Sequence, residues 1–184
     1  YGRFTLPDDG GTTHFCVVDA AGNAVVCTET INTTFGSLVV EPRTGIVLNN
    51  EMDDFTAIPG AANAFGLRQS PRNSIAPGKK PLSSMTPTIV LKEGRVVALA
   101  GASGGPRIIT STLQVLLRML EFDESAASAV AASRLHHQWQ PAELLYEAGY
   151  APFESHFTQR GHVTRPSGGL AATQAIRITP RGLE

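Results

Sequence analysis

Apolar and polar positions alternate in two stretches near the beginning of the chain. Residues 13–18 and 23–31 are rich in β-branched side chains, and residues 19–22 between them have the composition of a turn. This pattern predicts an antiparallel β-hairpin in which successive side chains point to opposite faces.

The register of this hairpin decides which polar side chains meet. If Val17 faces Val25, then Thr12 lies opposite Thr30, and Asn32 follows two residues later on the same face. A threonine at the beginning of one strand then has a second threonine and an asparagine beside it. We therefore predict a polar site at this end of the hairpin.

The same register separates the two cysteines. Cys16 and Cys27 then point to opposite faces of the hairpin, which disfavours a disulfide. A slip of one residue would bring the cysteines together but would turn Thr30 away from Thr12. We adopt the first register and predict free cysteines.

A second hairpin leads directly into a helix. Residues 88–91 and 95–100 have strand composition, and apolar residues recur at helical spacing after Pro106, which suits the first helical position. The periodic residues are Ile109, Leu113, Leu116, Leu117 and Leu120.

The rest of the chain adds strands and helices in mixed order. A long connection rich in Pro, Gly, Ala and Asn covers residues 56–80, and such a connection suits an active-site lid or a surface loop. Two hairpins, a helix pair and further strands predict an α+β layered domain rather than a βαβ repeat. The other expected elements are a buried strand at 46–48, an alanine-rich helix at 124–134 capped by Asp123, a strand at 144–147, a helix at 152–160 and a strand at 173–178.

Composition places the chain among ordinary globular proteins. Its 184 residues are 42% hydrophobic and 17% charged, which disfavours fibrous and disordered classes. The formal net charge is -1 and the basic residues are scattered, so no nucleic-acid surface is expected. No apolar run reaches the roughly 20 residues of a membrane helix, so no membrane insertion is expected. The two cysteines match no zinc spacing, and no structural metal is expected.

Thr12 is a candidate nucleophile because it follows two glycines. A threonine hydroxyl needs a base, and the residue's own α-amine can serve once the preceding peptide bond is cut. Gly10 and Gly11 allow the tight turn that attack of the Thr12 hydroxyl on the Gly11 carbonyl requires. Thr30 would then hold the hydroxyl, and Asn32 would offer its amide to a substrate. Taken alone, these residues are more typical of a loop that enters a sheet with paired threonines.

Gly104 and Gly105 immediately precede the predicted helix. Backbone N–H groups at a helix N-terminus stabilise an anion, such as the oxygen of a tetrahedral intermediate in acyl transfer. Phosphate is a competing ligand, but the phosphate-binding pattern G-x-x-x-x-G-K-[ST] is absent. A simple strand-to-helix turn is the other alternative.

Two polar pairs could bind the ends of an amino acid. Asp53 and Asp54 suit a substrate ammonium or the cap of a turn. Ser83 and Ser84 suit a substrate carboxylate or a serine turn before a strand.

Two adjacent histidines look like a further catalytic pair. His136 and His137 are neighbours in sequence, so their side chains point in different directions. Neither has metal-ligand spacing with a third group. We therefore assign both to structural roles.

Six motifs occur in order along the chain: DDGGTTHFCVVD, TETINTTFGS, GIVLNNEMDDF, PGKKPLSSMTPTIV, GASGGPRIIT and RLHHQWQP. Together they resemble the small catalytic subunit of γ-glutamyltransferases, also called glutathione hydrolases, of the N-terminal nucleophile hydrolase superfamily. The resemblance extends from about Asp8 to Pro141 and continues more weakly to about Ile178.

The resemblance implies a role for each matching residue. Thr12 would be the nucleophile and the first residue of the mature subunit, and Thr30 would orient its hydroxyl. Gly104 and Gly105 would supply the oxyanion donors. The resemblance also implies a lid, residues 58–70, in which Phe65 occupies a position where tyrosine is common. The amino-acid end of the γ-glutamyl group would be held by Asn32, Glu51 and Asp54, with Asp54 on its ammonium and Ser83 and Ser84 on its carboxylate.

The implied activity is γ-glutamyl transfer from glutathione and other γ-glutamyl compounds, or their hydrolysis, through a γ-glutamyl-threonine acyl-enzyme. The acceptor would be an amino acid, a peptide or water, and no cofactor is implied. The implied fold is an αββα sandwich that a large and a small subunit share. Self-cleavage before Thr12 would produce the two subunits. The implied location is periplasmic or extracellular.

The resemblance also divides the chain. Residues 1–11 would precede the cleavage site, and residues 12–184 would form a small-subunit domain that stops before the family's C-terminal tail. A related N-terminal nucleophile acylase, of the cephalosporin or poly-γ-glutamate type, is an alternative. An unprocessed inactive fragment that only binds a ligand or a partner chain is another.

Overall fold

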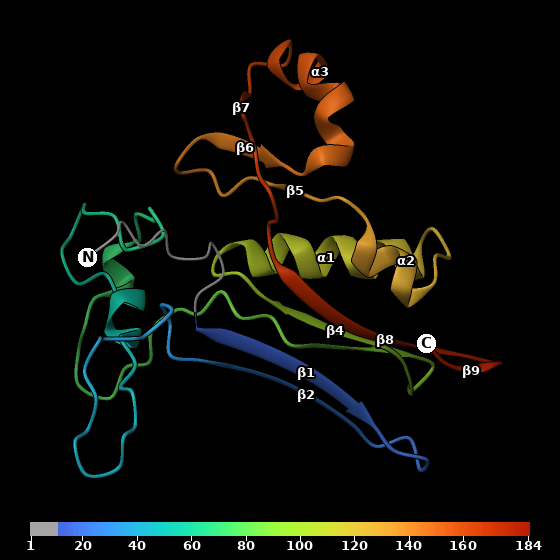
Figure 1. Ribbon diagram of the computed structural model, residues 1–184, viewed down its shortest axis with the longest axis horizontal. Helices are drawn as coiled ribbons and strands as arrows, with labels where there is room; N and C mark the ends of the chain where they lie inside the picture. The colour runs from blue at the N-terminus through green and yellow to red at the C-terminus, as the bar shows by residue number, and fades with distance from the viewer. Residues whose placement is uncertain (1–10) are drawn as a thin grey trace.

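The computed structural model describes residues 11–184 as stacked layers of strands and helices (Figure 1). The expected pre-cleavage segment therefore lies, except for Gly11, outside the described residues. Within the described part of the chain, no helix is long and apolar enough to cross a membrane.

The first layer is the predicted hairpin. Strands β1 (Thr12–Val18) and β2 (Ala24–Thr30) pair in the predicted register, with Val17 opposite Val25 and Thr12 opposite Thr30. The Asp19 carboxylate holds the turn because it accepts hydrogen bonds from the N–H groups of Ala21 and Asn23, both at 2.9 Å. Both cysteines are free, as predicted.

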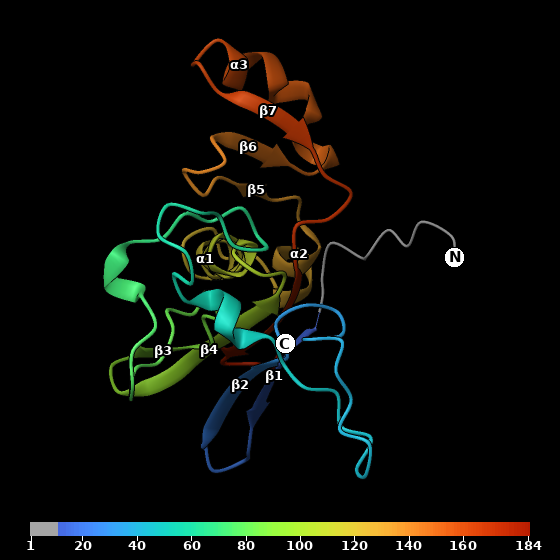
Figure 2. The same ribbon diagram turned by 90° about the vertical axis from the view of Figure 1, so that its left-hand side faces the viewer.

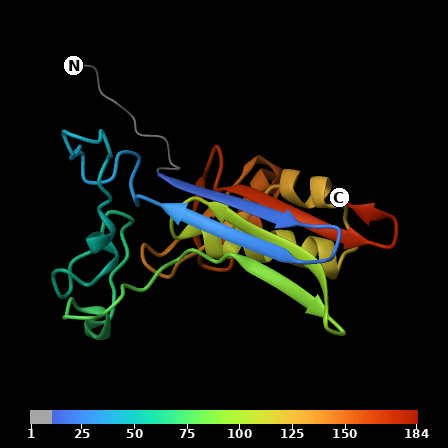
Figure 3. The same cartoon turned by 90° about the horizontal axis from the view of Figure 1, so that it is seen from below.

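The second layer is a four-stranded sheet. Its strands are β3 (Thr88–Lys92), β4 (Arg95–Ser103), β8 (Ala172–Thr179) and β9 (Gly182–Leu183), in the order β3-β4-β8-β9. The hairpin packs across the face of this sheet (Figure 3). At their contact the ring of His14 occupies the space where a side chain at Gly101 would lie. Glycine at this position therefore allows the two layers to approach closely.

Two helices form the third layer, on the other face of the sheet. Helix α1 (Arg107–Leu120) and helix α2 (Ala126–Ala131) follow β4 in sequence. Pro106 lies just before α1, one position earlier than predicted. The core between helices and sheet consists of Ala98, Val115, Met119, Ala126 and Ala129.

The helical spacing of the apolar residues is confirmed as helix α1, but it does not mark the buried face of this helix. Ile109 and Leu113 are 48% and 53% exposed, whereas Ile108, Ser111 and Val115 are buried. The helix is apolar around most of its circumference, so helical spacing alone does not identify the stripe that packs on the sheet.

Helix α2 is shorter than predicted and has a different cap. Ser125 is its N-cap and accepts a hydrogen bond from the Ser128 N–H at 3.2 Å. Asp123 instead has a φ of 55° and pairs with Arg177 of β8. The expected cap was wrong because the chain bends once more before the helix begins.

A small mixed sheet lies on the opposite side of α1 from β4 (Figure 2). Its strands are β5 (Leu135–His136), β6 (Glu143–Tyr146) and β7 (Val163–Pro166). β6 and β7 are parallel, so the chain between them makes one crossover that the sequence did not predict. This crossover contains η3 (Ala148–Phe153) and α3 (Glu154–Thr158), near the expected helix.

The long connection between β2 and β3 lies at the end of the sandwich where β1 begins (Figure 1). It contains two short 3-10 helices, η1 (Glu51–Asp54) and η2 (Pro71–Asn73). The predicted buried strand at 46–48 is wrong, because Ile46 is 59% exposed and only an isolated bridge joins Val40 to Val47. An apolar run does not form a buried strand when no layer lies over it.

Candidate active site

Thr12 and Thr30 face each other at the paired ends of β1 and β2. Their hydroxyl oxygens lie 2.8 Å apart, as the predicted register requires. The Thr30 hydroxyl also accepts a hydrogen bond from the Asn32 N–H at 2.8 Å. Asn32 is buried with a φ of 76°, and its side-chain amide donates to the Asn50 carbonyl at 3.2 Å. The Thr12 hydroxyl is therefore held by a partner that is itself fixed.

Gly11 adopts a conformation that other residues rarely take. Its φ is 77°, and the Thr33 carbonyl oxygen occupies the space where a side chain would lie. The Gly11 carbonyl accepts a hydrogen bond from the Ile31 N–H at 3.0 Å. Attack on the Gly11 carbonyl carbon would make this oxygen negative. The Ile31 N–H is already placed to stabilise that charge.

The packing of the two sheets brings the end of β4 to this site. The contact between His14 and Gly101 lies two residues from the first residue of β1 and two from the last residue of β4. β1 begins at the end of the sandwich where β4 finishes (Figure 3). The Thr12 end of the hairpin therefore lies close to Ser103, which is buried, and to the two glycines that follow it.

Gly104 and Gly105 form a constrained loop between β4 and α1. Their φ angles are 143° and 59°, which favour glycine. A Cβ on Gly104 would lie 2.9 Å from both the Ala171 Cβ and the Leu170 carbonyl oxygen. A Cβ on Gly105 would lie 2.9 Å from the Phe65 ring. With a 14-residue helix behind it, this loop has the geometry of an anion-binding helix N-terminus.

Two carboxylates of η1 are close together near this site. Burial, reinforced by the charge of Asp54, raises the pKa of Glu51 to about 7. Burial also raises the pKa of Asp54. The Glu51 Oε1 atom is buried without a hydrogen-bond partner among residues 11–184. The raised pKa values show that the ionised forms of these two carboxylates are unfavourable. A bound cation would stabilise the ionised forms.

η1 is tied directly to the threonine pair. The Asn50 side-chain oxygen accepts hydrogen bonds from the Thr33 N–H at 3.2 Å and the Thr33 hydroxyl at 3.1 Å. The Asn50 N–H donates to the Ile31 carbonyl at 3.3 Å. The turn that follows Thr30 therefore positions the residue immediately before Glu51.

Ser83 and Ser84 also lie toward this end of the sheet. β3 pairs with β4 from Thr88 opposite Ala100, so the chain preceding β3 runs back along the end of β4. The Ser83 hydroxyl accepts a hydrogen bond from the Met85 N–H at 3.1 Å, which is the local serine turn considered as the alternative. Ser84 is half-buried.

The two adjacent histidines differ as expected. His136 is buried, hydrogen-bonds Thr110 and Gln138 at 2.8 Å each, and has a pKa lowered mainly by burial. His137 is exposed and packs edge-on against His162. Neither adjoins the threonine pair in these contacts, so both fit structural roles.

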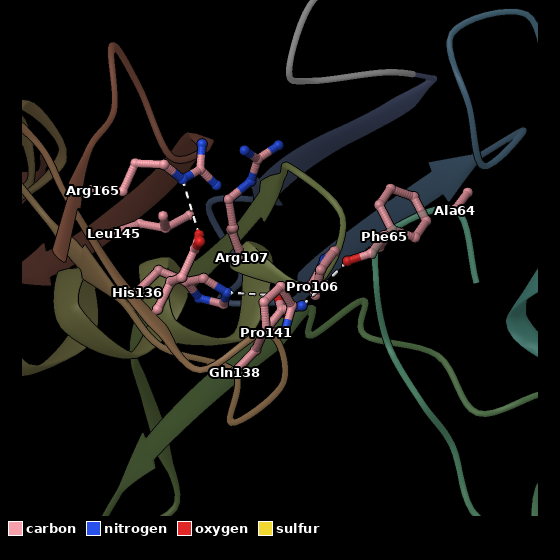
Figure 4. Close-up of a pocket in the computed structure, with 10 residues that line it drawn as sticks. Ala64, Phe65, Pro106, Arg107, His136, Gln138, Pro141, Leu145 and Arg165 are labelled. Atoms are coloured by element: carbon pink, nitrogen blue, oxygen red, sulfur yellow. Dashed lines mark hydrogen bonds and ion pairs between the residues drawn. The ribbon is translucent and has the colours of Figure 1, made fainter. Parts of the chain in front are cut away.

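A cavity of about 290 Å³ lies beside the glycine loop (Figure 4). Phe65 stands on one side of it, and Pro106 and Arg107 continue its wall from the loop. Sequence reasoning did not identify Gln138 as part of this wall, because it lies far from Phe65 in sequence. The cavity is lined by Ala64, Phe65, Pro106, Arg107, His136, Gln138, Pro141, Glu143, Leu145 and Arg165.

Other residues of the site were also missed from the sequence. His14 fills the space over Gly101, Asn50 fixes η1, and Ser103 is buried beside the glycine loop. The even-numbered face of the predicted hairpin was a signal for His14, which lies two residues from Thr12 on the same face. The other two had no local signal.

Comparison with known families and proteins gives consistent matches. A family model described as gamma-glutamyltranspeptidase matches residues 1–184. The glutathione hydrolase proenzyme of Escherichia coli K12 is 42% identical over 182 residues, covering 98% of this chain and 31% of that protein. The chain therefore spans about a third of the length of this relative.

Solved structures extend the match to the fold. A chain of a Helicobacter pylori gamma-glutamyltranspeptidase mutant has a TM-score of 0.87 and 40% identity, with 94% of this chain and 95% of that chain covered. Cephalosporin acylase from Bacillus halodurans has a TM-score of 0.77 at 22% identity, covering 97% of this chain and 34% of that one, and so shares the fold. These matches confirm the predicted α+β fold of the αββα type.

Proposed function

Because the chain belongs to the gamma-glutamyltranspeptidase family, we propose that it transfers γ-glutamyl groups from glutathione and other γ-glutamyl compounds, or hydrolyses them, through Thr12. The observation that carries this proposal is the hydroxyl contact of Thr12 with Thr30 at the end of the sandwich that also holds the Gly104–Gly105 loop. A nucleophile, a partner that orients it and an anion-binding loop are the parts that acyl transfer requires.

Activation begins with cleavage of the bond before Thr12. The Thr12 hydroxyl attacks the Gly11 carbonyl carbon, and the resulting negative oxygen is stabilised by the Ile31 N–H that already bonds it. The C–N bond then breaks, the nitrogen takes up a proton, and Gly11 is joined to the Thr12 oxygen as an ester. Water hydrolyses this ester, which frees both the hydroxyl and the α-amine of Thr12.

The free amine then acts as the base for transfer. It takes the proton of the Thr12 hydroxyl, whose oxygen attacks the γ-carbonyl carbon of the donor. The N–H groups of Gly104 and Gly105 stabilise the oxyanion, and the donor's amine leaves with the proton. Water or an amine acceptor then attacks the γ-glutamyl ester and restores Thr12. Every step uses side chains and backbone groups, so the proposal includes no cofactor.

The donor's amino-acid end is held by the polar groups around the threonine pair. Glu51 and Asp54 bind its ammonium, because a cation relieves the destabilised pair of carboxylates. Ser83 and Ser84 bind its carboxylate, and Asn32 contributes to the same pocket. Phe65 covers the glycine loop as part of a lid.

A large subunit of the same precursor is the proposed partner. The outer face of the β1–β2 hairpin exposes Phe15, Val17 and Val25, which are 46%, 52% and 56% exposed. A helical layer over this face would complete an αββα sandwich and bury these side chains. We propose residues 12–184 as part of the small subunit, and a periplasmic or extracellular location.

Turnover of matched substrates tests the proposal. The assembled enzyme should release the amine from a γ-glutamyl anilide much faster than from the corresponding glutaryl anilide, which lacks the ammonium. Equal turnover of both would favour an acylase of the cephalosporin type, which need not bind that group. Absence of turnover, with the chain still intact before Thr12, would favour an unprocessed protein that only binds ligand or partner.

A further inference from the structure

The tip of the 58–70 segment is bonded to the loop between β5 and β6. The Gln138 side-chain amide donates a hydrogen bond to the main-chain carbonyl of Phe65 at 3.2 Å (Figure 4). The Phe65 ring lies against Gly105, on the loop proposed to bind the oxyanion. A residue of the β5–β6 loop thus holds the backbone of Phe65, whose ring covers the glycine loop.

The orientation of this amide is determined by its neighbours. The Gln138 Nε2 group donates to the carbonyls of both Phe65 and Gln140, the latter at 3.1 Å. Its Oε1 atom then accepts from His136 Nε2 at 2.8 Å, while His136 Nδ1 accepts from the Thr110 hydroxyl at 2.8 Å. Burial lowers the pKa of His136 and so favours the neutral ring, which has one proton for this chain of bonds. Thr110 of α1 therefore fixes the orientation of the Gln138 amide through His136.

The opposite side of the segment is bonded to η1. Asp53 accepts a hydrogen bond from the Ala64 N–H at 3.0 Å. Asn63 braces the tip from within, because its side-chain oxygen accepts from the N–H groups of Phe65 and Leu67, both at 3.0 Å. The tip is consequently held as one unit between Asp53 of η1, which adjoins the proposed substrate ligand Asp54, and the amide of Gln138.

We propose that Gln138 is a positioning residue that holds this lid over the glycine loop and thereby sets how the acyl-enzyme divides between water and an amine acceptor. This inference rests on the proposed function. Phenylalanine has no hydroxyl with which to fasten the lid, and the bond to Gln138 fastens it through the main chain instead. Opening of the lid would admit bulk water to the ester on Thr12 and would favour hydrolysis.

Two substitutions in the assembled, processed enzyme test this proposal. Gln138→Met preserves the side-chain length but removes the donor, and Gln138→Glu preserves the acceptor for His136 while removing the donor. Gln159→Glu, at an exposed position after α3, is the control for added charge. Backbone hydrogen exchange within residues 61–68 should accelerate about five-fold in both Gln138 variants, as expected from loss of one neutral hydrogen bond, and should be unchanged in the control.

The second readout is the ratio of transfer to hydrolysis at a fixed acceptor concentration. This ratio should fall several-fold in both Gln138 variants, and the effect of Gln138→Met should largely disappear when Phe65→Ala has already removed the ring from the glycine loop. Unchanged hydrogen exchange would overturn the positioning role, and faster exchange with an unchanged ratio would overturn the effect on partition. If the unsubstituted enzyme turns over no γ-glutamyl substrate, the proposed function fails, while hydrogen exchange still tests the contact.

Discussion

The Thr12 and Thr30 hydroxyls, 2.8 Å apart, join the first residue of β1 to the last residue of β2. Thr30→Val should lower kcat on the order of 10- to 100-fold, because a freely rotating Thr12 hydroxyl is often misplaced for attack. Thr30→Ser keeps the hydroxyl and should retain most of the activity. The measurement is steady-state turnover of a γ-glutamyl anilide by processed enzyme. Equal kcat values for the two variants would remove Thr30 from the mechanism.

Gly11 should be required for self-cleavage. Gly11→Ala places a side chain against the Thr33 carbonyl in a backbone conformation that alanine disfavours. The matched control is Gly22→Ala. Gly22 also has a positive φ, of 85°, but a side chain added there would have no atom within 4 Å. Gel analysis of purified precursors should show uncleaved Gly11→Ala protein and normally cleaved Gly22→Ala protein. Normal cleavage of both would contradict the requirement for glycine immediately before Thr12.

Binding of a γ-glutamyl ligand should release protons near pH 7. The pKa of Glu51 is about 7, so a bound ammonium would favour its ionised form. Affinity should therefore rise as the pH increases through about 7 and should fall below it. Calorimetry in buffers of different ionisation enthalpy measures the protons released. Glu51→Gln should abolish the part of the proton release that comes from Glu51. An identical proton release in that variant would contradict the assignment of this release to Glu51.

A buried ion pair should stabilise the loop that supports Gly104. The Arg134 guanidinium lies 3.4 Å from the Glu147 carboxylate, which also accepts from the Leu170 N–H at 2.8 Å. Glu147→Ala leaves that guanidinium buried without its partner, and should lower the free energy of unfolding by about 3–5 kcal/mol. Glu143→Ala breaks the exposed pair with Arg165 and should cost less than about 1 kcal/mol.

Denaturant unfolding of the assembled protein measures both effects. Because Leu170 and Ala171 lie against Gly104, Glu147→Ala should also reduce kcat in the protein that remains folded. Equal destabilisation by the two substitutions would contradict the special role of the buried pair.

The first hairpin could be predicted from sequence in detail. Alternating β-branched residues and a short polar turn specify both strands and their register, so the contact between Thr12 and Thr30 followed from local pattern. The local sequence pattern did not predict features that depend on packing between layers. It did not identify which stripe of α1 faces the sheet, nor that Ile46 lies exposed.

The rest of the site depends on contacts between distant segments. The resemblance of the motifs indicated Gly104, Gly105 and Phe65, but only the fold places the Phe65 ring against Gly105. The bond from Gln138 to Phe65 joins residues 73 positions apart, and no periodicity or motif spacing predicts it. Such contacts arise from the stacking of layers, which a linear pattern does not specify.

The central claim is that Thr12, freed by cleavage, carries the γ-glutamyl group during turnover. The most direct measurement is mass spectrometry of enzyme quenched in acid during reaction with a γ-glutamyl donor. We predict a small-subunit chain that begins at Thr12 and is heavier by one γ-glutamyl group, which fragmentation places on Thr12. A chain that turns over the donor while the Gly11–Thr12 bond remains intact, or that carries the group on another residue, would contradict the account.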